Sequence, residues 1–335
     1  MKYLFELSRD HDSIPIGEVV SCLESEEIDY TILEKNSDIL VVNTDNQEKI
    51  KDVAVRLSHT FFISNFLFSS DVNMSEIKSK SEKNQIQEGG SIAVKYKNRS
   101  QYIDSRSIIE MLAGIYTKNR SVDLEKPDIE IRALITDSRV YTGIKLFEIE
   151  RSQFEHRKVQ NRPFFSPISL HPKIARALVN LSCVKKSETL LDPFCGTGGI
   201  LLEAGLIGAR VIGSDVEQKM IKGSKKTLDF YNIKDYNLFH SDVGEITNHI
   251  GKVDAIATDF PYGKSTTTKG EDMSALYTRT FDTFTNILKK NGRAVVGLSD
   301  KNWIKKASKY LDLLEVHEIR AHRSLTRFFV VFEQP

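Results

Sequence analysis

Hydrophobic and polar positions in the second half of the chain predict a regular alternation of strands and helices. Apolar runs lie at 189–192, 209–215, 237–242, 253–259 and 293–300, and amphipathic segments lie at 199–207, 218–231, 274–290 and 302–311. This alternation is typical of an α/β domain with a mostly parallel, doubly wound sheet, which binds ligands at the carboxyl ends of its strands. Two further runs, 313–321 and 327–334, have no helix between them, so one of them is expected to run antiparallel at the sheet edge.

The first 150 residues predict two smaller α+β units joined by a polar segment. Residues 1–68 combine strand-like runs with two helical segments, and residues 92–150 combine a strand, an amphipathic helix and two longer strands. Residues 69–91 are rich in Ser, Lys and Glu and close with Gly-Gly-Ser, which predicts a linker. Residues 151–165 carry charge and proline and predict an exposed connector, which leaves 166–335 as the alternating domain.

Composition excludes several classes of protein. The chain has 335 residues, 40% of them hydrophobic and 28% charged, and no apolar run reaches the length of a membrane span. The N-terminus lacks the pattern of a secretory signal, so a cytoplasmic location is expected. Cys22, Cys183 and Cys195 are far apart in sequence, which argues against a disulfide framework and against a zinc site. No metal is therefore expected.

Four of the predicted strands end in an acid, namely Asp192, Asp215, Asp242 and Asp259. The first opens the sequence DPFCGTGG (192–199), whose glycines let backbone amides approach a ligand at a helix N-terminus. A carboxylate at 192 would repel a pyrophosphate but could accept hydrogen bonds from an ammonium group. The acid at 215 stands 17 residues after Gly198, the usual place for a side chain that accepts both hydroxyls of a ribose.

The acid at 242 is placed to accept a hydrogen bond from the exocyclic amine of an adenine. Each of these acids alone would more often be a turn or helix-cap residue. An ammonium group, a ribose and an adenine amine together describe S-adenosylmethionine, so the combination predicts that cofactor.

On these residues, 166–335 resembles the class I (Rossmann-like) methyltransferases. DPFCGTGG stands at the cofactor loop of that family, and VIGSD and FHSDV stand at its ribose and adenine positions. The HPK segment (171–173) would border the methionine end of the cofactor. The resemblance implies cofactor binding by Pro172, Asp192, Phe194, Cys195, Gly196, Thr197, Gly198, Asp215, Val216, Asp242 and Val243.

The sequence TDFPYG (258–263) is similar to the D/N-P-P-Y signature with which this superfamily methylates an exocyclic nitrogen conjugated to a planar ring. Such a nitrogen is a poor nucleophile because its lone pair is delocalised. Asp259 and the carbonyl of Phe260 would accept both amine hydrogens, Pro261 would stiffen the turn, and Tyr262 would stack on the base. Positioning would then support one in-line displacement. Phe260 replaces the first proline of the signature.

A second resemblance covers almost the whole chain. Residues 92–150 look like a THUMP domain, 1–68 match in kind the ferredoxin-like unit that precedes THUMP, and 165–335 are similar to THUMP-containing tRNA guanosine N2-methyltransferases. The archaeal enzymes that act on the guanosine at tRNA position 10 are the nearest in kind. This resemblance implies one or two methyl transfers to the amine of a flipped guanosine. The expected partner is tRNA, and the expected assembly is a monomer.

The net charge of +1 hides an uneven distribution. Residues 93–120 contain six Lys or Arg residues and two acids, although such a stretch is more often a solvated face than a nucleic-acid site. The candidate phosphate contacts in this stretch are Lys95, Lys97, Arg99, Arg106, Lys118 and Arg120.

Two kinds of alternative stay open, and a third lacks a required motif. The same chemistry could act on the guanine amine of ribosomal RNA or on the adenine amine of DNA, although a THUMP-like unit argues against DNA. The chain could also be a non-catalytic RNA-binding factor on a methyltransferase fold, which Phe260 favours and the intact Asp259 opposes. A THUMP-linked thiouridine synthetase would need a phosphate-binding SGG-type loop, which the sequence lacks.

Overall fold

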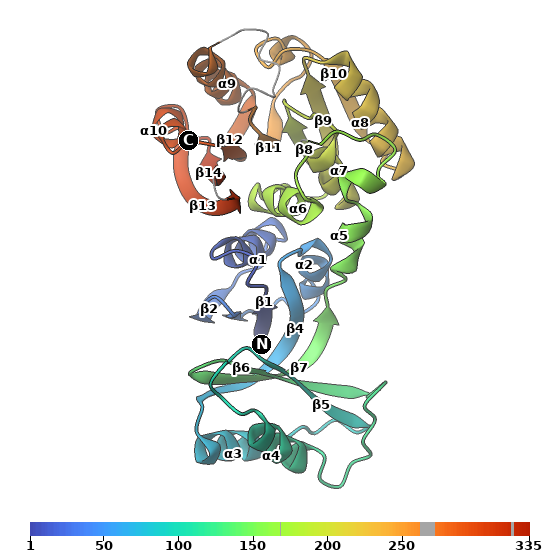
Figure 1. Cartoon of the computed structure of the whole chain (residues 1–335), viewed down its shortest axis with the longest axis vertical. Helices are drawn as coiled ribbons and strands as arrows, with labels where there is room; N and C mark the ends of the chain where they lie inside the picture. The colour runs from blue at the N-terminus through green and yellow to red at the C-terminus, as the bar shows by residue number, and fades with distance from the viewer. Residues whose placement is uncertain (168, 262–271, 323–324) are drawn as a thin grey trace. The chain divides into compact units, whose positions relative to one another are not determined.

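The computed structural model describes residues 1–167, 169–261, 272–322 and 325–335 (Figure 1). These residues form two compact units, each with its own seven-stranded sheet. Unit 1 comprises Met1–Ser8, Asp29–Ala54 and Thr60–Ile149, and unit 2 comprises Arg9–Ile28, Val55–His59 and Glu150–Pro335.

Unit 1 contains one mixed sheet with the strand order β2-β3-β1-β4-β7-β6-β5. The strand β4 pairs antiparallel with β1 on one side and with β7 on the other, so the two predicted α+β units share a single sheet. The strands are β1 (Lys2–Leu7), β2 (Thr31–Lys35), β3 (Ile39–Asn43), β4 (Thr60–Asp71), β5 (Ile92–Asn98), β6 (Ile129–Ile135) and β7 (Arg139–Glu148), and the helices are α2 (Ile50–Arg56), α3 (Met74–Lys83) and α4 (Arg106–Tyr116).

Residues 69–91 are not the linker that their composition predicts. They contain the end of β4 and the helix α3, whose first turn is capped by the side chain of Asn73. The helix buries Ile77 in the core of unit 1, while its other faces carry Lys and Glu. The narrow apolar stripe leaves the average composition polar, which is why the segment resembles a loop.

The sheet of unit 2 has the strand order β10-β9-β8-β11-β12-β14-β13. The first five strands in this order are parallel, as predicted. The antiparallel strand is β14, which lies one position in from the edge strand β13 rather than at the edge. The strands are β8 (Thr189–Asp192), β9 (Arg210–Asp215), β10 (Tyr236–His240), β11 (Val253–Asp259), β12 (Leu288–Leu298), β13 (Asp312–His322) and β14 (Leu325–Glu333).

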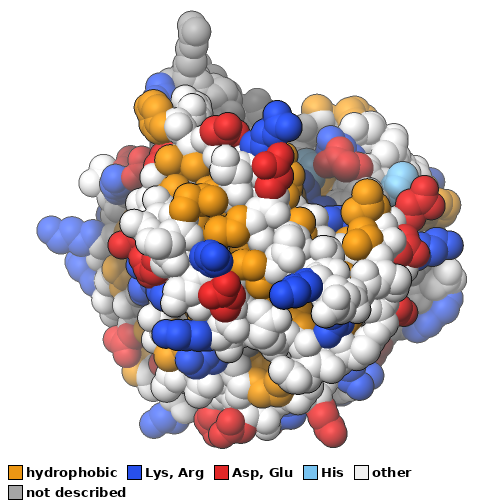
Figure 2. Space-filling model, turned by 90° about the horizontal axis from the view of Figure 1, so that it is seen from below, with side chains coloured by type: hydrophobic (Ala, Val, Ile, Leu, Met, Phe, Trp, Pro, Cys, Tyr) orange, Lys and Arg blue, Asp and Glu red, His pale blue; other side chains and the backbone are white. Residues whose placement is uncertain are grey.

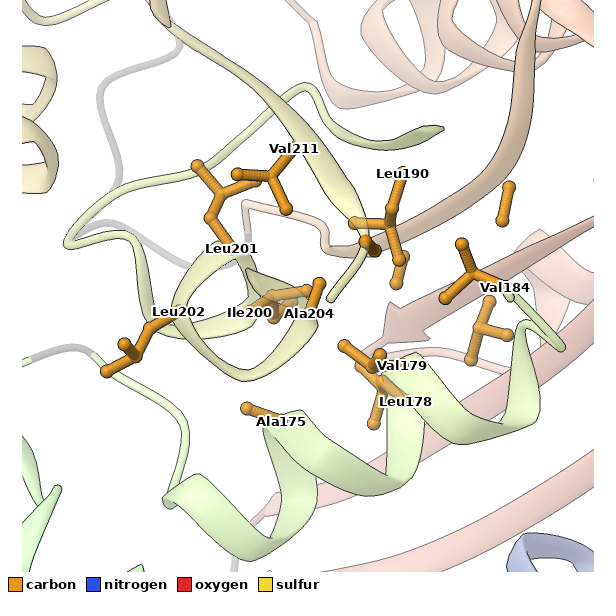
Figure 3. Packing of buried hydrophobic residues seen from close by; sticks show 14 of the residues in the cluster. Ala175, Leu178, Val179, Val184, Leu190, Ile200, Leu201, Leu202, Ala204 and Val211 are labelled. Atoms are coloured by element: carbon orange, nitrogen blue, oxygen red, sulfur yellow. The ribbon is translucent and has the colours of Figure 1, made fainter. Parts of the chain in front are cut away.

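Helices cover both faces of this sheet. Because side chains alternate along a strand, Ala255 and Ala257 of β11 face one core and Ile256 faces the other. The first core holds α6 (Pro172–Leu181), α7 (Gly199–Leu206) and α8 (Gln218–Phe230), and the second holds α9 (Met273–Ile287) and α10 (Asn302–Ala307). Figure 1 shows these two layers, and Figure 3 shows Leu178 and Val179 of α6 pointing toward α7.

The helix α1 (Ile14–Ser25) belongs to unit 2, although its place in the sequence predicts the N-terminal unit. Its Glu18 is fully buried and accepts hydrogen bonds from the backbone nitrogens of Ser58 at 3.1 Å and His59 at 2.8 Å, and from the side chain of Asn180 at 2.9 Å. Burial raises the pKa of Glu18, but the hydrogen bonds from His59 and Ser58 outweigh it and lower the pKa below its ordinary value. The ionised carboxylate therefore fixes α1 to unit 2.

Residues 151–165, predicted as an exposed connector, are partly folded into unit 2. They contain α5 (Ser152–His156) and a short 3₁₀ turn, Val159–Asn161. A second 3₁₀ turn, Ile246–Asn248, lies outside this segment, between β10 and β11. Arg157 is buried and pairs with the fully buried Glu203 of α7 at 2.7 Å. At least one charged residue of this segment, Arg157, therefore forms an ion pair inside unit 2 and is not at the surface.

Candidate active site

The four acids that end predicted strands lie at the carboxyl ends of the parallel strands of unit 2. This end of the sheet is called the carboxyl edge, or simply the sheet edge, and is distinct from the edge strand β13. Asp192 ends β8, which lies between β9 and β11 in the sheet. Asp215 ends β9, and Asp259 ends β11. Asp242 follows β10, in which His240 is opposite the acid that ends β9. The parallel pairing therefore places all four acids along one edge, as the alternating pattern predicts.

The loop between β8 and α7 has the backbone shape that its glycines predict. Gly196 and Gly198 have φ of +48° and +76°, a region that other residues rarely adopt. A Cβ on Gly198 would also lie 3.1 Å from the side chain of Ser224. The hydroxyl of the buried Thr197 lies 3.0 Å from that of Ser169, which connects the loop to the segment before α6.

Asp215 anchors this loop to β9. Its carboxylate accepts hydrogen bonds from the backbone nitrogens of Gly196 at 3.0 Å and Glu217 at 2.8 Å. Burial raises the pKa of Asp215, and these two bonds oppose the shift. Each carboxylate oxygen has a second lone pair, so the side chain can still accept from a diol.

Asp192 is the most deeply buried of the four acids, with 2% of the residue exposed. Its Oδ1 accepts hydrogen bonds from the hydroxyl of Thr258 at 2.6 Å and from the backbone nitrogen of Phe194 at 3.2 Å. Burial raises the pKa of Asp192 to about 7, because these bonds offset only part of the cost of burying a charge. A cation bound beside this side chain would favour its ionised form.

Asp242 is held by an arginine that sequence patterns do not single out. Arg279 of α9 forms a bidentate ion pair with it, with Nη2 2.9 Å from Oδ2, and the backbone nitrogen of Gly244 donates to Oδ1 at 2.8 Å. An adenine amine would share this carboxylate with Arg279. The neighbouring Val243 is buried in the core, and Val216 is half-buried.

The other predicted cofactor residues line the same loop or the start of α6. Cys195 is 5% exposed, and burial raises the pKa of its thiol well above the ordinary value, so it packs as a wall and is a poor nucleophile. Phe194 is half-buried beside it. Pro172 is the buried first residue of α6, and the Nδ1 of His171 accepts a hydrogen bond from the backbone nitrogen of Lys173 at 3.2 Å.

The turn after β11 is fixed by two hydrogen bonds. The backbone nitrogen of Phe260 donates to the carbonyl of Gly297 on β12 at 3.1 Å. The hydroxyl of Tyr277 on α9 donates to the carbonyl of Pro261 at 2.8 Å. Tyr262, the predicted stacking residue, lies outside the residues that the structure describes.

The ring of Phe260 is part of the unit 2 core, with 1% of the residue exposed. Its centroid lies 5.3 Å from that of Phe194, 4.8 Å from that of Tyr277 and 5.3 Å from that of Phe281. These contacts join the turn to the loop after β8 and to α9. Packing therefore supplies the rigidity that a proline would give at this position.

The structure separates the predicted phosphate contacts into three groups. The side chain of Arg99 is 6% exposed and is bonded to Asp38 at 2.6 Å and to the carbonyl of Leu7 at 2.7 Å, so it is not available to a phosphate and is not retained as a candidate. Lys95 pairs with Glu130 at 2.9 Å, Arg106 pairs with Glu110 at 2.8 Å, and Arg120 donates to the carbonyl of Ile86 at 2.6 Å. Lys97 and Lys118 are exposed.

In the view of Figure 2, no continuous positive face is seen. There, Lys and Arg side chains alternate with acids and with hydrophobic side chains. Sequence counts of charge overestimate such a surface because they cannot tell which arginines are used internally.

Sequence patterns missed three polar residues at the sheet edge, namely Thr258, Arg279 and Arg327. The first directly precedes a predicted catalytic acid, so its position was the one available signal. The two arginines come from α9 and β14, and only the packed fold brings them to Asp242 and Asp259.

Among the described residues, no group of three or more His, Cys, Asp or Glu could hold a metal ion. None of the helices that the structure describes is long and apolar enough to cross a membrane.

Comparison with known proteins adds direct relatives. A family model described as RMKL-like, methyltransferase domain, matches residues 160–328. A tRNA (guanine(10)-N2)-dimethyltransferase of Methanothermobacter thermautotrophicus is 34% identical over the full length of both chains, and one of Methanocaldococcus jannaschii is 31% identical over 98% of this chain and 99% of its own. The crystal structure of TrmN from Thermus thermophilus has a TM-score of 0.58 at 17% identity and covers 99% of this chain and 100% of that one.

Proposed function

The chain belongs to the tRNA (guanine(10)-N2)-dimethyltransferase family and has an RMKL-like methyltransferase domain, and from this we propose how its strand-end residues work. It is an RNA methyltransferase that uses S-adenosylmethionine to methylate the exocyclic N2 amine of a guanosine in tRNA. The observation that carries the proposal is the row of four acids on one sheet edge beside the glycine loop.

The residues at this edge fit the cofactor. The left-handed Gly196 and Gly198 let backbone amides approach a ligand closely, and the buried Asp192 is suited to a cationic ligand. We assign Asp215 to the ribose and Asp242, with Arg279, to the adenine amine. When bound, S-adenosylmethionine supplies an electrophilic methyl group on a sulfonium.

We assign the reaction centre to the turn after β11. The Asp259 carboxylate and the Phe260 carbonyl accept the two hydrogens of the guanine amine, which directs the nitrogen lone pair toward the methyl group. The displacement is in line and needs no covalent intermediate, because the N–C bond forms as the S–C bond breaks, and the Asp259 carboxylate accepts the proton that the amine releases. Tyr262 is proposed to stack on the flipped base, by analogy with the D/N-P-P-Y signature.

We propose that unit 1 holds the RNA. Residues 1–68 and 92–150 are interpreted as the ferredoxin-like and THUMP units, both of which contribute strands to its shared sheet, a division supported by the sequence resemblance. A base amine in folded RNA is reached only after flipping, which requires a binding surface beyond the reaction centre. Guanosine 10 and two successive methyl transfers are proposed because the relatives carry those words in their names.

The acceptor assay separates tRNA from the alternatives. Purified protein and radiolabelled S-adenosylmethionine are incubated with tRNA, with ribosomal RNA and with duplex DNA. Label in tRNA alone supports the proposal. Label in ribosomal RNA or DNA alone, or cofactor binding with no transfer to any of them, favours the alternatives.

We further propose a cytoplasmic location and a monomer. The location follows from a tRNA substrate. The monomer is proposed from the sequence alone.

Cofactor affinity is expected to depend on pH through Asp192. Its pKa of about 7 means that the carboxyl is mostly protonated below pH 7 and charged above it, and only the charged form stabilises a cation. Binding therefore strengthens as pH rises through 7, and the Kd at pH 6 should be about tenfold higher than at pH 8. Calorimetric titration measures this, and the isosteric Asp192→Asn should remove the dependence. A pH-independent wild-type Kd would contradict the assignment.

Charge reversal at an exposed lysine of unit 1 is expected to weaken tRNA binding. Each of Lys97→Glu and Lys118→Glu should raise the Kd and reduce the slope of log K against log salt by about 1, the loss of one phosphate contact. The matched control is Lys51→Glu, an exposed lysine of α2 outside the basic stretch. Filter binding at several salt concentrations measures the Kd for tRNA and its salt dependence. A slope equal to that of wild type in both variants would contradict a phosphate contact by these lysines.

A further inference from the structure

The predicted catalytic acid has a buried partner on another strand. Arg327 of β14 forms an ion pair with Asp259 through Nη2 and Oδ1. The two side chains are 7% and 20% exposed, so the pair is largely shielded from water. An ion pair in such a place is stronger than a surface pair, and it costs more to assemble.

The pair forms across a strand that lies between its members. In the sheet order, β12 separates β11 from β14, and Gly297 of β12 is opposite Asp259. A Cβ at 297 would collide with the carboxylate oxygen and would lie 2.9 Å from the arginine Nη2. The absence of a side chain at this one position is what allows the arginine to reach across.

Arg327 remains a cation at neutral pH in this place. Burial lowers its pKa to about 10, which is still well above 7. Its guanidinium also lies 5.2 Å from the centroid of the Phe329 ring, so the side chain is held from a second direction. A buried guanidinium is costly to keep, and here its charge is directed at the acid of the reaction centre.

We propose that Arg327 is a positioning residue for methyl transfer. By holding Oδ1 of Asp259, it stops the carboxylate from rotating and keeps Oδ2 directed at the acceptor amine. This inference rests on the proposed function, because it assumes that Asp259 binds that amine. A displaced acceptor oxygen would leave the nitrogen lone pair poorly aligned with the methyl group.

The test compares Arg327→Met, Arg327→Lys and Gly297→Ala with wild type in the full-length protein. Arg327→Met should lower kcat by about 10–100-fold, the cost of a misplaced reacting group, with KM for tRNA and the calorimetric Kd for S-adenosylmethionine within about twofold of wild type. Arg327→Lys should recover part of the loss. Gly297→Ala keeps both charged groups but separates them, so it should also lower kcat. The exposed Arg320 of β13 provides the matched control, Arg320→Gln, which should behave as wild type.

A double variant separates this inference from the function on which it rests. If Arg327 acts only through Asp259, then Asp259→Asn with Arg327→Met should lose no more activity than Asp259→Asn alone. Full activity in Arg327→Met, additive losses, or a kcat loss matched by equal loss of cofactor affinity would overturn the positioning role. Full activity in Asp259→Asn would instead overturn the proposed reaction centre itself.

Discussion

Replacing Asp259 with alanine is expected to lower kcat by about 10²–10⁴-fold, the range of a positioned proton acceptor. The guanine amine is a weak nucleophile until both of its hydrogens are accepted, and we propose that this carboxylate at the end of β11 is one of the two acceptors. Binding of S-adenosylmethionine and tRNA should stay near normal, because neither depends mainly on this side chain. Single-turnover methylation with radiolabelled cofactor gives the rate, and titration gives the two affinities.

The control for this variant is Asp282→Ala, which removes an exposed acid from α9. It should methylate at the wild-type rate. Turnover within a few-fold of wild type in Asp259→Ala would contradict the assignment of the reaction centre. A loss of cofactor affinity as large as the loss in rate would show instead that the variant disturbs the neighbouring loop.

Replacing Phe260 with alanine is expected to destabilise unit 2 by about 3–5 kcal/mol, the usual cost of removing a fully buried aromatic ring. The ring contacts Phe194, Tyr277 and Phe281, so the cavity would lie between the loop after β8, the turn after β11 and α9. The measurement is urea unfolding followed by the fluorescence of Trp303. This is the single tryptophan of the chain, and its ring centroid lies 4.4 Å from that of Tyr277.

Two further substitutions at this position separate the contribution of the aromatic ring to stability from that of the backbone. Phe260→Leu keeps most of the volume and should cost less than about 1.5 kcal/mol. Phe260→Pro restores the residue of the signature but loses the ring and the hydrogen bond from its backbone nitrogen to Gly297, so it should be at least as destabilising as alanine. Stability near wild type in the alanine or proline variant would contradict the packing role.

The sequence predicted the positions of the four strand-end acids better than it predicted the side chains that contact them. Asp192, Asp215, Asp242 and Asp259 could be found because strand endings are local signals and parallel strands end on one side. The partner Arg327 could not, since its contact depends on strand order and on the bare Gly297 between two strands.

The same limit explains the errors elsewhere in the chain. The composition of 69–91 suggested a linker, because the single apolar stripe of α3 is diluted by charged faces. Charge counting selected Arg99, whose guanidinium is buried against Asp38. Sequence position suggested that α1 belongs to the N-terminal unit, although the buried Glu18 joins it to unit 2. In each case a long-range contact decided what the local pattern could not.

The central claim is that the acids of one sheet edge direct a methyl group to the N2 amine of a guanosine in tRNA. Its most direct test is mass spectrometry of nucleosides from a tRNA transcript methylated by the purified protein, beside a transcript with inosine at position 10. Inosine lacks only the exocyclic amine of guanosine. The account predicts N2-methylguanosine and N2,N2-dimethylguanosine in the first transcript and no methylation of the second. Equal methylation of both transcripts, or a methylated adenosine, would contradict it.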